Sequence, residues 1–273
     1  AHFRDWYLLP MAAAIWSCPT AQMMAYPTGT FVRFCLNHGL LQITDRPQWL
    51  TVAGGGARYV QRLLDDLDDV RLGCPVRGIE RGPAGASLLT DAGRMSFDAV
   101  VLACHSDQAL RLLGAGATGA ERTVLGAVRY QPNTAWLHTD PSLLPRRRAL
   151  WSAWNYRAAG DEPGQRPVSV SYLINRLQPL PFEQPVVVSL NPERPPADEH
   201  VIERIEYAHP VFDRLAVEAQ ERLDALQGEQ GTWFAGAWSG FGFHEDGLRS
   251  ALTVAGRMGV EAPWQRQIEA VAA

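Results

Sequence analysis

Residues 232–258 constrain the fold most, because they combine a short apolar stretch, a glycine-rich turn and a helical pattern. The strand is expected at 232–235 and the helix from about 245 to 258. Glycines at 236, 240, 242 and 247 allow the backbone to approach a flat ligand closely. A helix start presents unpaired N–H groups and the positive end of the helix dipole, so it stabilises negative charge. On spacing alone, a plain strand-to-helix turn with an acidic first turn is favoured over a ligand-binding turn, which remains the alternative.

Length and charge limit the classes of protein to consider. With 273 residues, of which 47% are hydrophobic and 20% charged, the chain is long enough for one large domain or two intertwined ones. The formal net charge is -4, and the longest basic run is Arg146-Arg147-Arg148. Binding to nucleic acid therefore has little electrostatic support.

The basic residues and the cysteines of this chain limit its chemistry and its cellular compartment. All 25 basic residues are arginine, so a mechanism that needs a lysine amine must find it outside this chain. This usage, with many Ala and Gly residues, is typical of a GC-rich bacterial genome. The cysteines at 18, 35, 74 and 104 form no CxxC pair, which argues against a zinc knuckle or a disulfide scaffold and suits a reducing cytoplasm. The apolar stretch 8–16 is too short to cross a bilayer.

Hydrophobic periodicity predicts a mixed α/β fold. Helices are expected within 1–48 and at 57–67, 106–113 and 211–226. Strands are expected at 70–72, 76–80, 87–90, 97–103, 134–138, 150–155, 168–174, 186–190 and 201–207. The order of these elements is interleaved, which two consecutive domains do not explain. We expect an α/β unit from 49–113 and 228–260, a helical and antiparallel unit from 1–48 and 114–227, and a tail at 261–273.

Several long segments carry a family resemblance. They are FRDWYLLPM at 3–11, NHGLLQITDRPQW at 37–49, CHSDQA at 104–109 and GFHEDGL at 242–248, together with the strand, turn and helix near the end of the chain. The chain resembles the flavin-containing amine oxidase superfamily, in particular a bacterial branch of predicted NAD/FAD-binding proteins. The resemblance implies FAD as cofactor and a two-domain architecture. Residues 49–113 and 228–260 would belong to the FAD-binding domain, and 1–48 and 114–227 to the substrate domain.

The resemblance also implies which residues contact FAD. Gly236, Ala237 and Trp238 would lie along the ribityl chain and pyrophosphate. Asp246, Gly247 and Leu248 would fall where backbone N–H groups meet the flavin carbonyl O2 and stabilise negative charge on the reduced flavin. Val76 would contact the adenine through its backbone. The expected set also includes Ala103, Cys104 and His105 beside the dinucleotide, and Gly242, Phe243 and Glu245 in the turn.

The sequence departs from the superfamily's pattern in three ways. No carboxylate stands at Ala237 or Trp238 to bind the ribityl hydroxyls, and no lysine is present to act near flavin N5. Both departures weaken the case for amine oxidation, not the case for flavin. The third is that no GxGxxG element is found, since Gly54-Gly55-Gly56 does not fit the spacing. We therefore expect the architecture without its first βαβ unit, an upstream segment of roughly 120–150 residues, and an isolated chain that is inactive.

Individual side chains are open to more than one interpretation. His244 is the candidate for proton transfer beside the flavin, but a histidine that caps or packs at the helix start is favoured over it. His38, Trp49, Trp151 and Trp154 are assigned to the substrate region. His38 is equally plausible as a hydrogen bonder at a helix end, and most of the nine tryptophans are expected in the core.

Taken together, these features predict an FAD-dependent oxidoreductase that transfers a hydride from an organic, apolar and lipid-like substrate to flavin N5, in a desaturation or isomerisation. The alternatives are an amine oxidase proper and a non-catalytic flavin-binding or interaction module. We expect a cytoplasmic protein with a small-molecule or lipid-like substrate, no nucleic acid and no metal. Peripheral membrane contact and the oligomeric state are left open.

Overall fold

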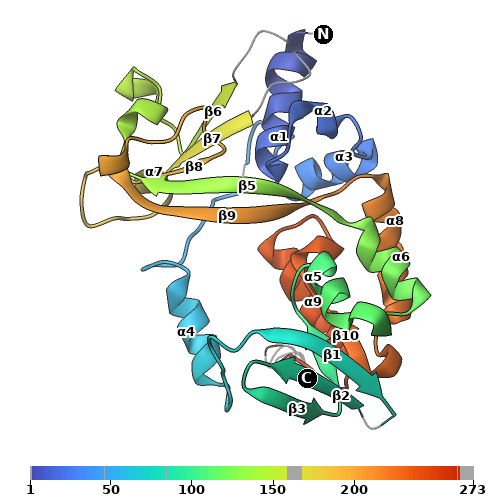
Figure 1. The fold of residues 1–273 in the computed structure, drawn as a ribbon. Coiled ribbons are helices and arrows are strands. Elements are labelled where there is room, and N and C mark those ends of the chain that lie inside the picture. Colours follow the sequence, from blue (N-terminus) through green and yellow to red (C-terminus); the bar gives the residue numbers. More distant parts are fainter. Residues whose placement is uncertain (1, 46, 84, 159–167, 263, 265–273) are drawn as a thin grey trace, which may run out of the picture. The chain divides into compact units, whose positions relative to one another are not determined.

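The structure, a computed structural model, describes residues 2–45, 47–83, 85–158, 168–262 and 264 (Figure 1). It divides into two compact units, Ala1–Val70 with Tyr130–Val211 and Arg71–Arg129 with Phe212–Ala273. Within the described residues, no helix is both long enough and apolar enough to cross a membrane.

The limits of these units differ from the expected division at three places. Residues 49–70 belong to the first unit, and residues 114–129 and 212–227 to the second. The last two stretches join the second unit because the helices they form pack on each other, and the first of these helices also packs on the helix at 106–113. The assignment of one unit to FAD and the other to substrate stays a prediction. Most of the expected tail at 261–273 lies outside the described residues.

The first unit contains a five-stranded sheet in the order β6-β7-β8-β5-β9. Its strands are β5 (Arg129–His138), β6 (Trp154–Ala158), β7 (Val168–Leu173), β8 (Val187–Leu190) and β9 (Val201–Val211). β6 pairs with β7, β7 with β8, and β8 with β5, all antiparallel. The antiparallel sheet predicted for this part of the sequence is therefore present.

Short helices accompany this sheet. They are η1 (Arg4–Leu8), α1 (Leu9–Trp16), α2 (Thr20–Met23), α3 (Thr28–Asn37), α4 (Ala57–Asp65) and α7 (Ile174–Leu177), with single turns η3 (Pro141–Leu143), η4 (Arg148–Leu150) and η5 (Asp198–His200). α1 packs against β6 and β7. At the end of α1, the buried Trp16 ring lies 5.2 Å from that of Tyr26 and 4.7 Å from that of Phe34, which joins α1 to α3.

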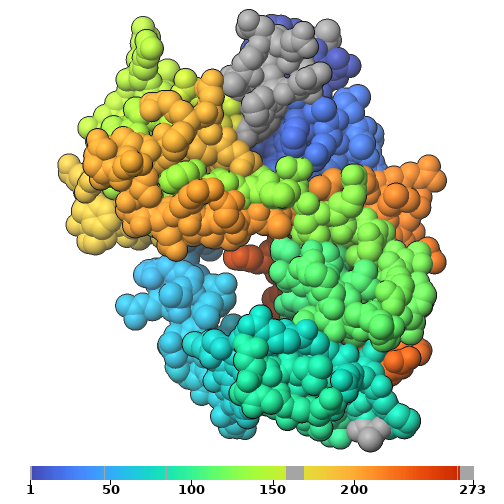
Figure 2. Space-filling view, viewed as in Figure 1, coloured from blue at the N-terminus to red at the C-terminus, as the bar shows by residue number. Residues whose placement is uncertain are grey.

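α4 differs from these helices because it buries none of its residues. Its apolar side chains include Tyr59, Val60 and Leu63, and Leu63 is 62% exposed. Figure 2, in which this helix is light blue, shows its side chains at the surface. The apolar face that the sequence predicts for 57–67 is thus present, but no described residue buries it.

A chain of buried polar groups crosses the middle of the first unit's sheet. The Ser171 and Ser189 hydroxyls are 2.7 Å apart, and His138 Nε2 lies 2.8 Å from Ser189 Oγ. His138 Nδ1 accepts a hydrogen bond from the Asp140 N–H at 3.0 Å, so the ring proton must be on Nε2 and is donated to Ser189. His138 is fully buried and must be neutral to make both bonds.

The second unit contains two small sheets. β1 (Val76–Gly82), β2 (Gly85–Thr90) and β3 (Gly93–Phe97) form an antiparallel sheet. β4 (Val100–Leu102) and β10 (Thr232–Phe234) form a parallel pair. The helices are α5 (Ser106–Leu113), α6 (Gly119–Ala127), α8 (Arg214–Arg222) and α9 (His244–Arg257), with turns η2 (Gly114–Gly116), η6 (Leu223–Leu226), η7 (Glu229–Gly231) and η8 (Ala237–Ser239).

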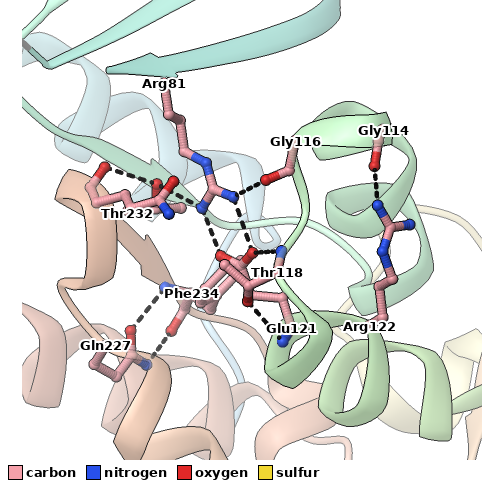
Figure 3. A network of polar contacts seen from close by, with 10 residues as sticks. Arg81, Gly114, Gly116, Thr118, Glu121, Arg122, Gln227, Thr232 and Phe234 are labelled. Atoms are coloured by element: carbon pink, nitrogen blue, oxygen red, sulfur yellow. Dashed lines mark hydrogen bonds and ion pairs between the residues drawn. The ribbon is translucent and has the colours of Figure 1, made fainter. Parts of the chain in front are cut away.

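A buried ion pair connects these pieces (Figure 3). The Arg81 guanidinium donates to both carboxylate oxygens of Glu121, at 2.5 and 2.9 Å, and to the Gly116 carbonyl at 2.6 Å. The two side chains are only 3% and 1% exposed. Burial would raise the pKa of Glu121, but hydrogen bonds from Arg81 and the Thr118 N–H outweigh it and lower the pKa. The pair therefore ties β1 to the start of α6.

The edge of β10 that faces away from β4 is also occupied. The Gln227 side-chain amide donates to the Phe234 carbonyl at 2.7 Å and accepts from the Phe234 N–H at 2.9 Å. The Gly228 N–H donates to the Thr232 carbonyl at 2.9 Å. Residues 227 and 228 thus satisfy the backbone groups that a neighbouring strand would otherwise bind.

Several local predictions were wrong. Residues 70–72 form no strand, because the chain turns there at Gly73 (φ +65°) and leaves Leu72 85% exposed. The strand expected at 150–155 begins only at Trp154, after the turn η4. β3 was missed because all its residues are exposed or half-buried, so it shows no apolar alternation. α6 was missed although Thr118 and Glu121 form a capping box at its start.

The buried ion pair predicts a contrast between two arginines of the same strand. Arg81→Met leaves the Glu121 carboxylate buried without its partner, and should destabilise the second unit by about 3–5 kcal/mol. Arg77 also lies on β1 and pairs with Asp91, but both side chains are more than half exposed. Arg77→Met should therefore cost less than about 1 kcal/mol. Hydrogen exchange of β1 and α6 peptides measures both, and equal effects would contradict this account.

His138 predicts how the stability of the first unit depends on pH. Burial lowers the pKa of His138, so on acidification the unfolded chain takes up this proton first, from about pH 6.5. Stability should fall as the pH drops below that value, and His138→Gln should flatten the fall in urea unfolding midpoints.

Asp140 supplies an internal control, because hydrogen bonds from Ser142 and Ala197 outweigh its burial and lower its pKa to about 2. The contribution of Asp140 to stability is lost only between about pH 4 and pH 2. In this range the His138→Gln variant should still lose stability, because it retains Asp140. An unchanged pH profile above pH 5 in His138→Gln would rule out this role for His138.

Candidate functional site

The parallel pairing of β4 and β10 creates the candidate site within the second unit. Phe234 pairs with Leu102, and the Ala235 N–H donates to the Leu102 carbonyl at 3.1 Å. Both strands therefore end at the same edge of the sheet, where 103–105 and 236–238 follow them. The carboxyl edge of parallel strands is where α/β folds place their ligands.

Trp238 locks these two connections together. Its indole is buried, and its Nε1–H donates to the Cys104 carbonyl at 3.0 Å. Gly236 has φ +155°, and a Cβ there would lie 2.7 Å from the Trp238 indole nitrogen, so the position requires glycine. The predicted residues Cys104, Gly236 and Trp238 thus meet, with the Trp238 ring inside the protein. A contact of Trp238 with FAD would have to use its backbone.

A second set of hydrogen bonds shapes the turn into α9. Gln220 of α8 donates to the Trp238 and Gly240 carbonyls at 2.9 and 2.7 Å. The Ser250 hydroxyl accepts from the Gly236 N–H at 2.9 Å and donates to the Gly247 carbonyl at 2.7 Å. The course of the turn is therefore fixed by side chains from two helices. Nothing in the sequence pattern marks Gln220, Gln227 or Ser250, and all three were missed.

Asp246 caps the start of α9. It is buried, and its carboxylate accepts a hydrogen bond from the Phe243 N–H at 3.0 Å. Its negative charge in the first turn also interacts favourably with the helix dipole. A Cβ at Gly240 would collide with this carboxylate. His244, the first residue of α9, is exposed, and both interpretations of its role stay predictions.

The outer face of the turn is available to a ligand. Ala103, Gly242, His244, Glu245 and Leu248 are exposed. The N–H groups of Asp246 and Gly247 already donate to the Phe243 carbonyl, at 3.0 and 3.2 Å. The first-turn N–H groups left for a ligand are therefore those of His244 and Glu245, which precede the three predicted residues Asp246, Gly247 and Leu248. The arrangement fits the electron-rich edge of a flavin.

The other predicted cofactor contacts lie on neighbouring elements. Val76 is half-buried at the start of β1, where it pairs with Thr90. His105 is half-buried and immediately precedes α5, and its N–H donates to Gln108 Oε1 at 3.2 Å. Burial raises the pKa of the Cys104 thiol, which is therefore a poor nucleophile at neutral pH.

The four predicted substrate residues all lie in the first unit, but in different surroundings. His38 ends α3, with Nδ1 3.0 Å from the Phe34 carbonyl, which is the alternative role considered for it. Trp49 is 71% exposed in an irregular segment. Trp151 packs against the buried cluster of Leu144, Leu173 and Val187. Trp154 is half-exposed on β6, edge-on to the Tyr172 ring at 5.4 Å. Their assignment to a substrate site stays a prediction.

No group of three or more His, Cys, Asp or Glu side chains suited to a metal ion occurs among the described residues.

A parallel strand pair that leads through a glycine turn into a helix start defines a nucleotide-cofactor-binding α/β protein. Residues 28–183 match the family of flavin containing amine oxidoreductases, and the chain belongs to this family. Membership implies FAD as the cofactor. The predicted family, the mixed α/β architecture of flavin amine oxidases and the cofactor are therefore confirmed.

Solved structures share the fold at low sequence identity. A CLA-producing fatty acid isomerase from P. acnes is 16% identical, with a TM-score of 0.52 over 74% of this chain and 52% of that one. A putative protoporphyrinogen oxidase from Exiguobacterium sp. 255-15 is 18% identical, with a TM-score of 0.55 over 84% and 57%. Reduced UDP-galactopyranose mutase is 12% identical, with a TM-score of 0.60 over 94% and 65%.

At these identities the likeness shows the fold alone, and the chain spans between half and two thirds of each of these structures. No curated protein matches the sequence.

The packing of Gly240 against Asp246 predicts a strong effect of one methyl group. Gly240→Ala should displace the Asp246 carboxylate from the Phe243 N–H and destabilise the second unit by about 1–3 kcal/mol. Gly256 in the last turn of α9 has no atom within 4 Å of an added Cβ, so Gly256→Ala should be neutral or stabilise by up to about 1 kcal/mol. Thermal unfolding compares the two, and a Gly240→Ala variant as stable as the parent would contradict this role of Asp246.

Proposed function

We propose that this protein is an oxidoreductase in which FAD accepts a hydride from a C–H bond of an organic, largely apolar substrate. The observation that carries the proposal is the start of α9, which has an exposed outer face and a rigidly hydrogen-bonded inner face. Family membership supplies the cofactor, and the absence of lysine in this chain favours a reaction that needs no lysine near flavin N5.

The residues of the turn would bind and orient the cofactor. The Trp238–Cys104 hydrogen bond fixes the spacing between the two connections that follow β4 and β10. The N–H groups of His244 and Glu245, with the positive end of the α9 dipole, would stabilise negative charge on the pyrimidine edge of the flavin. When bound, FAD supplies the hydride acceptor, and orientation of the substrate C–H bond provides much of the rate. The exposed His244 side chain is placed to exchange a proton with solvent.

An apolar substrate is supported by the chemistry of the first unit. Trp154 and Tyr156 of β6 are 48% and 39% exposed, so aromatic surface is available for acyl contacts. One structure with a similar fold is a fatty acid isomerase, which is consistent with this proposal. We therefore favour desaturation or isomerisation of a lipid-like molecule. An amine oxidase proper is the second candidate, since the family is defined by flavin-dependent amine oxidation.

We further propose that the ADP half of FAD is held by a segment beyond these 273 residues. The sequence has no GxGxxG turn. The β4–β10 sheet has only two strands within the described residues, and α4 presents an uncovered apolar face. An added βαβ unit would supply the missing phosphate-binding turn.

Two successive measurements test the function: whether the protein retains flavin, and whether substrates bleach it. The chain is purified alone and together with the sequence that its gene encodes on either side, and visible absorption reports bound flavin. We expect the extended form to be yellow. Mixed anaerobically with fatty-acyl substrates, the extended form should lose the visible absorption of oxidised flavin if it desaturates them. If it isomerises them, the hydride returns to the substrate, and the isomerised product is measured instead. Bleaching of the flavin by amines but never by lipids would contradict the proposed lipid-like substrate.

Two controls sharpen this experiment. Flavin that is retained, that no substrate class reduces and that isomerises no fatty-acyl substrate would support the non-catalytic module instead. If neither form retains flavin, the proposal is wrong. His244→Gln separates the roles of that residue: proton transfer predicts that the pH dependence of the reduction rate changes, whereas a purely structural role leaves it unchanged.

A further inference from the structure

A cavity of about 800 Å³ lies within the first unit. Its wall is formed by the segment around η3 and η4, by β6 and by Arg194. This volume is in the range that holds a small organic ligand. None of the residues predicted to contact FAD lines it, and of the predicted substrate residues only Trp151 does.

The cavity is lined by three arginines, Arg146, Arg157 and Arg194. Residues 140–157 with 193 and 194 contain five arginines (146, 147, 148, 157 and 194) but only two carboxylates (Asp140 and Glu193). The whole chain carries a net charge of -4, so this region is positive in an otherwise acidic protein. The three lining guanidiniums are exposed, so together they present a positive surface that attracts anions.

A hydrogen-bonded chain holds one of these arginines in place. The buried Asp140 carboxylate accepts hydrogen bonds from the Ser142 N–H at 2.8 Å and from the Ala197 N–H at 3.1 Å. The Ser142 hydroxyl donates its only proton to Asp140, so its oxygen is free to accept Arg194 Nη2 at 2.7 Å. Hydrogen bonds lower the pKa of Asp140 to about 2 despite its burial, so the anchor is ionised at neutral pH. Arg194 is therefore preorganised.

The other lining groups suit a ligand with an anionic end and an apolar part. Arg157 contacts Glu193 Oε2 through its Nε at 3.5 Å, and a guanidinium has four further N–H donors. Trp151 is fixed by its Nε1–H, which donates to the Pro145 carbonyl at 2.8 Å, and it packs on the buried cluster of Leu144, Leu173 and Val187. A rigid indole and a preorganised guanidinium thus belong to one wall.

We propose that this cavity binds a phosphate monoester whose organic part lies against Trp151 and Tyr156. Three guanidiniums balanced in part by Glu193 match the charge of a phosphate monoester better than that of a single carboxylate. Arginine forks bind phosphate oxygens bidentately, which gives geometric selectivity as well as affinity. The ligand is either a soluble ester or the headgroup of a lipid.

Binding of phenyl phosphate to the purified chain tests the proposal by calorimetry. We expect phenyl phosphate to bind more tightly than inorganic phosphate, phenol not to bind, and added NaCl to weaken the interaction. Arg146→Gln and Arg194→Gln should each weaken binding about tenfold. Ser142→Ala should also weaken it, because it releases Arg194 without changing any charge. Arg33→Gln, on the exposed side of α3, is the matched control and should have no effect.

Vesicles of phosphatidylcholine with and without phosphatidic acid distinguish the two sources of the ligand. Co-sedimentation that depends on phosphatidic acid and on Arg194 assigns the site to a lipid headgroup, and binding of phenyl phosphate alone assigns it to a soluble ester. Phenol binding as tightly as phenyl phosphate, equal binding by the parent and all cavity variants, or no binding in either arm would overturn the proposal.

Discussion

The buried pair of Arg81 and Glu121 is the interaction on which the second unit depends. Desolvation of two charges is unfavourable, and such a pair is tolerated only when its remaining donors and acceptors are also satisfied. Here the Gly116 carbonyl and the Thr118 N–H complete the set, so η2 and the start of α6 must lie where they do. Arg81 Nη1 also lies 3.4 Å from Thr232 Oγ1, so the same guanidinium reaches the first residue of β10. The position of β10 in turn decides where the turn into α9 begins.

The candidate site is a surface supported by a rigid interior. Trp238, Asp246 and Ser250 make their hydrogen bonds inward and hold the backbone, whereas His244, Glu245 and Leu248 point to the exterior. Preorganisation of this kind matters for a cofactor whose charge changes during reaction, because backbone dipoles that are already oriented need no rearrangement. The sequence motif therefore contains two kinds of residue, those that shape the turn and those that face the ligand.

The sequence predicted this division only in part. The strand, turn and helix near the end of the chain were found because glycine spacing and apolar periodicity are local signals, and α5 was predicted with the bounds that the structure shows. The supporting side chains were not found. Gln220 acquires its role through contacts with Trp238 and Gly240, outside its own helix, and Gln227 through a contact with Phe234 of the following strand. Likewise, Asp246 was expected to act through its backbone, and its carboxylate proved to be the cap. Arg81 and Glu121, forty positions apart, carried no local signal.

The hydrogen bonds of the Gln227 amide with Phe234 close one edge of the small parallel sheet. With that side of β10 closed by a side chain and by Gly228, hydrogen bonding can extend the sheet only along the free edge of β4, which no other described strand covers. The β10 edge of the sheet therefore resists edge-to-edge association, whereas the β4 edge can pair with a further strand. Gln227 and Gly228 thereby determine on which side of this sheet a further strand can pair.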